Sequence, residues 1–334
     1  MLAKGAMAGV GMIRVAVLDD YQRAALGAAD WKSLDPEVQV EASPDHIADP
    51  ETLARRLHTF EGVVLMRERT PFPKSLIERL PNLRLVVTAG MKNAAIDLEA
   101  CTARGILVCG TETLGTPTAE LTWGLIVALA RNIPFEAAAL RQGRWQSTLG
   151  VGLAGKTLGV VGLGRLGSQV AKIGGVFGMK VIAWSPNLTA DRARAAGAEL
   201  ASKDELFARA DFVTIHLVLG DRSRGLVGPA ELARMKPGAY LVNTSRGPIV
   251  QERALVDALK ARRIAGAAID VFDREPVAKG HPYLGLDNLL ATPHLGYVTA
   301  ENYRLIYGQA VEDIRGFLAG KPVRAMNAPA RNVV

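Results

Sequence analysis

The stretch Gly162-Leu163-Gly164-Arg165-Leu166-Gly167 decides the fold of this chain. It follows an apolar segment, residues 157–161, that is typical of a buried strand, and a helical pattern begins directly after it. In that context Gly162 permits a tight turn, Gly164 lets the backbone approach a pyrophosphate, and Gly167 lets the helix pack closely on the strand. The N–H groups at the start of the helix then face the phosphates. The stretch therefore predicts a dinucleotide-binding turn.

The end of the next predicted strand, residues 180–184, bears on the choice of dinucleotide. A carboxylate at such a position bonds the ribose hydroxyls of NAD and disfavours the 2′-phosphate of NADP. Here the strand is followed by Ser185-Pro186-Asn187, and the nearest arginines, Arg192 and Arg194, lie further along the chain. We therefore expect NAD or NADP as the cofactor, and the missing carboxylate slightly favours NADP.

Composition and charge exclude several classes of protein. The 334 residues, 49% of them hydrophobic, suit two domains of layered helices and strands. The net charge of +7 comes from scattered basic residues without a basic block, so we expect no nucleic-acid partner. The apolar segment 121–130 is too short to cross a bilayer, so we expect a cytoplasmic protein without a membrane partner. Cys101 and Cys109 fit buried thiols, not a disulfide or a metal site.

Alternating strand and helix patterns predict an α/β fold with two Rossmann-like or flavodoxin-like domains and parallel sheets. We predict a discontinuous substrate domain, residues 13–115 plus 298–334, into which a dinucleotide domain, residues 116–297, is inserted. Residues 1–12 are expected to be a disordered extension. The expected strands are 13–18, 38–40, 62–66, 83–87, 106–108, 157–161, 181–184, 212–216, 239–243, 266–271 and 289–291; the expected helices include 51–58, 74–80, 98–104, 118–131 and 300–318.

Three reactive side chains follow successive predicted strands of the second domain: Arg246, Glu275 and His294. Because ligands bind at the carboxyl ends of parallel strands, we expect them at one edge of the sheet. Each alone has an ordinary explanation, as a salt-bridging arginine, a loop carboxylate or a turn residue. Together they suit reduction of a 2-keto acid, in which His294 gives the proton, Glu275 favours its charged form and Arg246 binds the substrate carboxylate. His216 is a rival histidine at another strand end.

These segments resemble the D-isomer-specific 2-hydroxyacid dehydrogenases, of a glyoxylate or hydroxypyruvate reductase-like kind, from about residue 13 to residue 327. The resemblance rests on the fingerprint and on Asn243-Thr244-Ser245-Arg246-Gly247, Asp270-Val271-Phe272 with Glu275-Pro276, and Thr292-Pro293-His294-Leu295-Gly296. It implies that Arg246, Glu275 and His294 are catalytic and that Asp270 contacts the nicotinamide carboxamide. It also implies a loop whose backbone binds the substrate carboxylate, which matches Ala89-Gly90-Met91 with Lys92 beside it. The expected cofactor-binding residues are Gly162, Gly164, Arg165, Leu166, Gly167, Ser185, His216, Thr244, Asp270, His294 and Gly296.

The chain departs from the family pattern directly after that loop. Many members carry a Gly-x-Asp-Asn-Ile-Asp-like stretch there, whereas this chain reads Met91-Lys92-Asn93-Ala94-Ala95-Ile96-Asp97. Lys92 is either a solvated lysine or a cation that suits an additional anionic group on the substrate. Arg67 and Arg69, after a predicted strand, either line the same cleft or lie on the surface.

We predict an NAD(P)-dependent oxidoreductase, without a metal, that interconverts a small 2-keto acid and its D-2-hydroxy acid, with glyoxylate or hydroxypyruvate as first candidates. A 3-phosphoglycerate-type dehydrogenase is an alternative, because Lys92 leaves a phosphorylated substrate open. A dinucleotide-sensing, corepressor-like binding protein is the alternative of another class. The resemblance also implies a homodimer that pairs through the dinucleotide domain. The apolar helix near residues 121–130 would then lie either at that interface or buried between the two domains.

Overall fold

The structure is a computed structural model that describes residues 12–328, so residues 1–11 of the predicted extension lie outside it. The described residues divide into two compact units, residues 12–114 with 299–328 and residues 115–298. Each unit contains one sheet in which every pair of neighbouring strands is parallel. The predicted α/β class with two parallel sheets is therefore confirmed. The assignment of substrate and dinucleotide to the two units stays a prediction.

The first unit has five strands in the order β2-β1-β3-β4-β5. The chain passes from β1 to β2 on one side and continues with β3 on the other side of β1, so the strand order reverses there. The carboxyl ends of β1 and β3 therefore form the switch point where ligands bind in such sheets. The strands are β1 (Ile13–Val17), β2 (Val38–Ala42), β3 (Gly62–Leu65), β4 (Leu85–Thr88) and β5 (Leu107–Gly110). The helices are α1 (Ala25–Ala28), α2 (Pro50–Leu57), α3 (Lys74–Ile77), α4 (Leu98–Ala103) and α12 (Ala300–Leu318).

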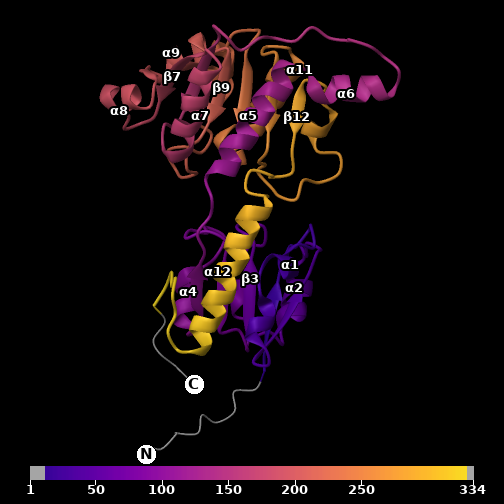
Figure 1. The fold of residues 1–334 in the computed structure, drawn as a ribbon, viewed down its shortest axis with the longest axis vertical. Coiled ribbons are helices and arrows are strands. Elements are labelled where there is room, and N and C mark those ends of the chain that lie inside the picture. Colours follow the sequence, from indigo (N-terminus) through magenta and orange to yellow (C-terminus); the bar gives the residue numbers. More distant parts are fainter. Residues whose placement is uncertain (1–11, 329–334) are drawn as a thin grey trace, which may run out of the picture. The chain divides into compact units, whose positions relative to one another are not determined.

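The sheet of this unit is apolar on both faces, which explains the runs of valine and leucine in its strands. Ala16, Val63, Leu65, Val86 and Val108 face one core with side chains from the helices α2, α3 and α4. The long helix α12, yellow in Figure 1, contacts β4 and α1 and belongs to the same unit although it follows the whole second unit in sequence. The predicted return of the last helix to the first unit is therefore confirmed. Helix α3 stops at Ile77, earlier than predicted, because Pro81 disfavours helical geometry at Leu80 before it.

The second unit has seven strands in the order β12-β11-β10-β9-β6-β7-β8. They are β6 (Thr157–Val161), β7 (Lys180–Trp184), β8 (Glu199–Leu200), β9 (Phe212–Ile215), β10 (Tyr240–Asn243), β11 (Gly266–Ile269) and β12 (Leu289–Ala291). The helices are α5 (Thr116–Ala130), α6 (Ile133–Arg141), α7 (Arg165–Val176), α8 (Ala190–Ala195), α9 (Lys203–Arg209), α10 (Pro229–Arg234) and α11 (Glu252–Lys260). Consecutive residues of β10, Leu241 and Val242, enter separate hydrophobic cores on the two faces. The sheet therefore presents only its edges and strand ends to ligands.

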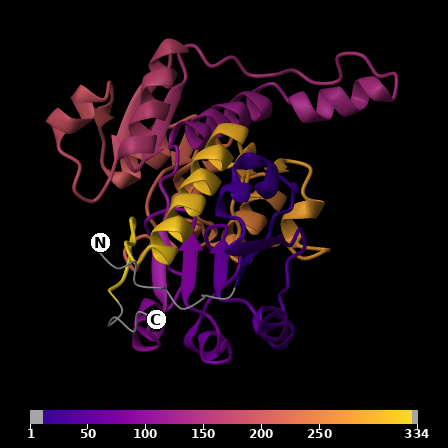
Figure 2. The same cartoon turned by 60° about the horizontal axis from the view of Figure 1, so that its bottom comes forward.

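Helix α5 packs on α7, β10 and β11 of its own unit and buries Trp123, Leu125 and Ile126. The helix therefore belongs to the core of the second unit. Helix α6 follows it, and the chain then returns to β6 as a long extended connection (Figures 1 and 2). Within residues 12–328 no single helix has the length and apolarity to cross a membrane; α5 and α6 pass only as a pair, with a bend of 61° between them.

Candidate active site

The glycine turn between β6 and α7 has three different steric environments. Gly162 has φ +100°, and a Cβ there would lie 2.7 Å from the carbonyl oxygen of His216. A Cβ on Gly167 would lie 2.0 Å from the carbonyl oxygen of Gly162, so the helix can pack on the turn only with glycine there. Gly164 has no atom within 4 Å of its Cβ position and faces open space. Contacts within the protein thus require glycine at positions 162 and 167, whereas the geometry of Gly164 leaves room for a ligand.

A cavity of about 600 Å³ adjoins this turn. Its wall includes Ser185, whose Oγ accepts a hydrogen bond of 3.0 Å from the N–H of Leu163. The ends of β7 and β9 supply the rest of the wall, including Trp184, Asn187, Leu188, Arg192, Leu217, Val218, Leu219, Asp221, Arg222 and Ser223. Sequence reasoning named Ser185 but did not find Arg222, because the segment after β9 carries no recognisable spacing. In dinucleotide-binding sheets this place beside the glycine turn accommodates the adenosine moiety.

The rival histidine, His216, is unsuited to act as a proton donor. Its Nε2 lies 2.9 Å from the hydroxyl of Thr214. Burial lowers the pKa of its imidazole to about 4, so the ring is neutral near pH 7. His216 does line the cavity beside the glycine turn, with its backbone against Gly162. It therefore contributes shape to that cavity and not acid–base chemistry.

His294 and Glu275 form a close pair at the carboxyl ends of β12 and β11. Nδ1 of His294 lies 2.6 Å from Oε2 of Glu275, and their side chains are only 18% and 26% exposed. The other carboxylate oxygen of Glu275 accepts a 2.9 Å hydrogen bond from the N–H of Phe272, which fixes the carboxylate. The ring of Tyr297 meets the imidazole edge-on at 5.1 Å. No partner of His294 Nε2 lies among residues 12–328, so this nitrogen remains available to exchange a proton.

Asp270, at the end of β11, holds the loop that carries His294. Its Oδ1 accepts hydrogen bonds from the hydroxyl of Thr292, at 2.6 Å, and from the N–H of Leu295, at 2.7 Å. Its Oδ2 accepts one from the N–H of Gly296 at 2.9 Å. Burial raises the pKa of this carboxyl. His294 itself has φ +52°, a conformation that a non-glycine residue keeps only where its surroundings hold it. Sequence reasoning missed this supporting role of Thr292, because short polar residues in loops carry no distinctive pattern.

Arg246 begins the loop after β10, the strand next to β11. It is half-buried, and its Nη1 donates a 2.8 Å hydrogen bond to the carbonyl of Ser245. A Cβ on the following Gly247 would lie 2.1 Å from the carbonyl carbon of Phe272, so this loop lies directly against the one that carries Glu275. Thr244 points away from that edge, since its hydroxyl pairs with the hydroxyl of Thr122 in α5 at 2.8 Å.

In the first unit the predicted substrate loop follows β4. Gly90 has φ +95°, Met91 and Lys92 are exposed, and Ala89 is buried. Nη1 of Arg67 lies 3.4 Å from the Cβ position of Gly90, so this guanidinium adjoins the loop. Arg69 does not lie on the surface: it is 9% exposed, and its Nη1 donates a hydrogen bond to the carbonyl of Asp19.

The remaining candidate groups are structural. Cys101 and Cys109 are buried free thiols, as expected, and burial raises their pKa values to about 11 and about 12. Among residues 12–328 no group of three or more histidine, cysteine, aspartate or glutamate side chains is placed to hold a metal ion.

Comparison with known proteins shows to which family this chain belongs. Residues 123–296 match the family described as "D-isomer specific 2-hydroxyacid dehydrogenase, NAD binding domain". The glyoxylate reductase of Aeropyrum pernix is 40% identical over 256 residues, which cover 74% of this chain and 76% of that protein. The chain belongs to the D-isomer specific 2-hydroxyacid dehydrogenase family. The resemblance and the enzyme class predicted from the sequence are confirmed, and the second unit contains the family's NAD(P)-binding domain.

Other relatives carry a different name. The D-3-phosphoglycerate dehydrogenase of Methanocaldococcus jannaschii is 40% identical over 275 residues, 80% of this chain but 52% of that protein. The chain thus spans about half the length of the phosphoglycerate dehydrogenases it matches. A solved structure from Ralstonia solanacearum, named after D-3-phosphoglycerate dehydrogenase, is 39% identical with a TM-score of 0.89, covering 94% of this chain and 96% of its own. The roles of individual site residues remain predictions.

Proposed function

We propose that this protein is an NAD(P)-dependent oxidoreductase that interconverts a small 2-keto acid and the corresponding D-2-hydroxy acid. The observation that carries the proposal is the 2.6 Å pair of Glu275 and His294, beside Asp270 and in the same unit as the glycine turn. When bound, the reduced nicotinamide supplies a hydride to the carbonyl carbon. His294 then gives the proton that the carbonyl oxygen requires, and in the reverse direction takes it back. Glu275 fixes the ring orientation, with Nε2 left for the substrate.

Arg246 is the proposed anchor of the substrate carboxylate in this unit, because a guanidinium binds a carboxylate through two parallel hydrogen bonds. The backbone of Ala89, Gly90, Met91 and Lys92 is the proposed carboxylate-binding loop of the first unit. The positive φ of Gly90 supports the proposal, since a turn of this kind directs successive N–H groups towards an anion. Glyoxylate and hydroxypyruvate are the first candidates, and the similarity to a glyoxylate reductase supports them.

A D-3-phosphoglycerate-type activity is the second candidate. Relatives of that name are 36% to 40% identical, and Arg67 beside Gly90 together with the exposed Lys92 supplies cations for a phosphate group. A dinucleotide sensor remains the alternative of another class.

One experiment separates these functions. The protein is mixed with NADH or NADPH and glyoxylate, hydroxypyruvate or pyruvate, and separately with NAD⁺ or NADP⁺ and 3-phosphoglycerate, while absorbance of the reduced nicotinamide is followed. We expect turnover of a small 2-keto acid, and a loss of roughly 10²–10⁴-fold in kcat for His294→Ala. His58→Ala, at the exposed histidine that caps the carboxyl end of α2, is the matched control and keeps full activity. Binding of the cofactor without oxidation across the panel favours the sensor.

The preferred cofactor is proposed to be NADP. Ser185 stands at the end of β7 in place of a carboxylate, and Arg192 and Arg222 line the same cavity, against a single carboxylate, Asp221. Two guanidinium groups attract the 2′-phosphate, which NAD lacks. The ratio of kcat/KM for NADPH and NADH tests this. We expect Arg192→Gln to lower the value for NADPH and to leave that for NADH unchanged; an equal effect on both cofactors contradicts the proposal.

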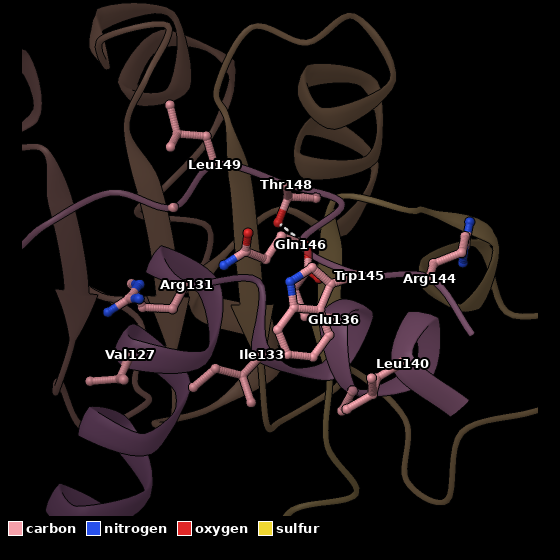
Figure 3. A pocket seen from close by; sticks show the side chains of 12 residues that line it. Val127, Arg131, Ile133, Glu136, Leu140, Arg144, Trp145, Gln146, Thr148 and Leu149 are labelled. Atoms are coloured by element: carbon pink, nitrogen blue, oxygen red, sulfur yellow. Dashed lines mark hydrogen bonds between the residues drawn. The ribbon is translucent and has the colours of Figure 1, made fainter. Parts of the chain in front are cut away.

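A homodimer is proposed to form through α6 and the segment that follows it. Ile133, Leu140, Trp145 and Leu149 are between 49% and 96% exposed and line a pocket of about 1010 Å³ (Figure 3). Glu136 holds this segment against α6 by accepting a 2.6 Å bond from the hydroxyl of Thr148. Since one segment supplies both protruding apolar groups and a groove, two copies are able to pair symmetrically. Sedimentation of the wild type and of Leu149→Arg tests this: a dimer that Leu149→Arg dissociates supports it, and a monomeric wild type refutes it.

A further inference from the structure

A buried polar network joins the loops that follow three neighbouring strands of the first unit. Asp19 follows β1, Thr70 lies in the loop after β3, and Asn93 lies in the loop after β4. The ends of β1 and β3 form the switch point of a sheet with the order β2-β1-β3-β4-β5, where ligands of open α/β sheets bind, and β4 is the next strand. The network therefore lies at the functional edge of the unit, although nothing in the family match, which begins at residue 123, covers it.

Asp19 is the centre of this network. It is 1% exposed and has φ +56°. Its Oδ1 lies 2.9 Å from Nδ1 of His46, and its Oδ2 accepts a 2.6 Å hydrogen bond from the hydroxyl of Thr70. Its carbonyl accepts a 2.7 Å hydrogen bond from Arg69, whose guanidinium lies 4.5 Å from the centre of the Tyr21 ring. Three bonds from the loop after β3 and from His46 thus hold a conformation that aspartate adopts only at a cost.

The same network continues to the proposed substrate loop. Asn93, 6% exposed, donates from Nδ2 to the carbonyl of Arg67 at 2.8 Å and to the hydroxyl of Thr88 at 2.9 Å. Arg67 also has a left-handed conformation, with φ +54°. Its Nε lies 3.6 Å from Glu68, and its Nη1 lies beside Gly90. The strained backbone of Arg67 is therefore held from both sides, by Asn93 at its carbonyl and by the bonds of Arg69 and Thr70 to Asp19.

We propose that Asp19, Thr70 and Asn93 are positioning residues that hold the Arg67 guanidinium against the Gly90 turn, so that Arg67 and the N–H groups of this turn bind one substrate carboxylate together. This inference rests on the proposed function in one respect, namely that the loop of residues 89–92 binds the carboxylate. The physical reason is pre-organisation. A long arginine side chain loses less conformational entropy on binding when its backbone is already fixed in the required conformation.

Thr70 offers a matched pair of variants. Thr70→Val keeps the shape of the side chain and removes the hydroxyl that donates to Asp19, whereas Thr70→Ser keeps the hydroxyl. For the best 2-keto acid we expect Thr70→Val to raise KM by roughly tenfold while kcat and the affinity for NAD(P)H change less than about twofold. Thr70→Ser should behave like the wild type. Asp19→Asn, which removes the charge with little change in volume, should raise KM in the same way.

Hydrogen–deuterium exchange supplies a readout that needs no turnover. Thr70→Val should speed amide exchange in residues 67–70 and also in residues 89–93, while Thr70→Ser leaves both segments protected. Faster exchange in the first segment alone, or an unchanged KM in an active Thr70→Val enzyme, overturns the proposal. A wild type that turns over no substrate refutes the proposed function, and the exchange experiment still decides whether the two loops are coupled.

Discussion

Replacing Gly164 with alanine separates the structural glycines of the turn from the one that we expect to face the cofactor. Gly162 and Gly167 meet backbone atoms at 2.7 Å and 2.0 Å from their Cβ positions, but the Cβ position of Gly164 has nothing within 4 Å. A methyl group therefore fits the protein without a clash. Gly164 is the N-cap of α7, where alanine costs about 1 kcal/mol relative to a good cap and somewhat less relative to glycine. Alanine also restricts the unfolded chain, which stabilises the folded state by about 0.4–1 kcal/mol. The net change in the free energy of unfolding is therefore close to zero.

Cofactor binding should respond quite differently. A methyl group on Gly164 stands where the pyrophosphate approaches the backbone, and it holds the phosphate away from at least one N–H group. Losing one hydrogen bond to a charged group costs about 1.5–3 kcal/mol, which corresponds to roughly a 10- to 150-fold increase in Kd.

The assay is titration of NADPH and NADH by fluorescence, combined with thermal unfolding. Gly175→Ala, in the same helix and with nothing within 4 Å of its Cβ position, is the control. It should keep the wild-type Kd and gain at most about 1 kcal/mol, because alanine forms helix better than glycine and Gly175 lies in the last turn of α7. Gly162→Ala should lower Tm sharply. An unchanged Kd for Gly164→Ala, or a loss of Tm like that of Gly162→Ala, refutes the reasoning.

Three further predictions concern charge and burial. Ser185→Asp should weaken NADPH relative to NADH by about 30-fold, because a carboxylate about 5 Å from the 2′-phosphate costs roughly 2–3 kcal/mol; an unchanged ratio of the two Kd values contradicts this. Burial raises the pKa of Asp313 to about 6. The folded pKa exceeds the ordinary value of 3.8, so the contribution of this carboxyl to the free energy of unfolding is fully present below pH 4. That contribution, about 3 kcal/mol, is lost as the pH rises through 6. In Asp313→Asn the free energy of unfolding, measured with urea, should not fall in this way between pH 4 and 6. An equal dependence on pH in the wild type and the variant would contradict this prediction. Cys101 and Cys109 should react with a thiol reagent at pH 8 far more slowly in the folded protein than in urea, because burial raises both pKa values, and rapid reaction of the folded protein would show an opening of the core.

Most of the strands were predictable because each is a short apolar run bounded by polar residues. The positions of Arg246, Glu275 and His294 after consecutive strands were equally readable, since parallel strands bring their carboxyl ends together whatever the loops do. Short elements such as β8 and α8 were not predicted, because a few residues of mixed polarity carry too little periodicity.

The sequence by itself determined the glycine turn, the family and the set of residues available for hydride and proton transfer, because these depend on local spacing. Tertiary structure decided what each residue does. Burial lowers the pKa of His216 to about 4, and Arg69 turns inward to bond Asp19. The contacts of Asp270 with the His294 loop join residues more than 20 positions apart in the chain. Such contacts depend on which strand ends become neighbours, and the order of strands in a sheet is a property of the whole fold.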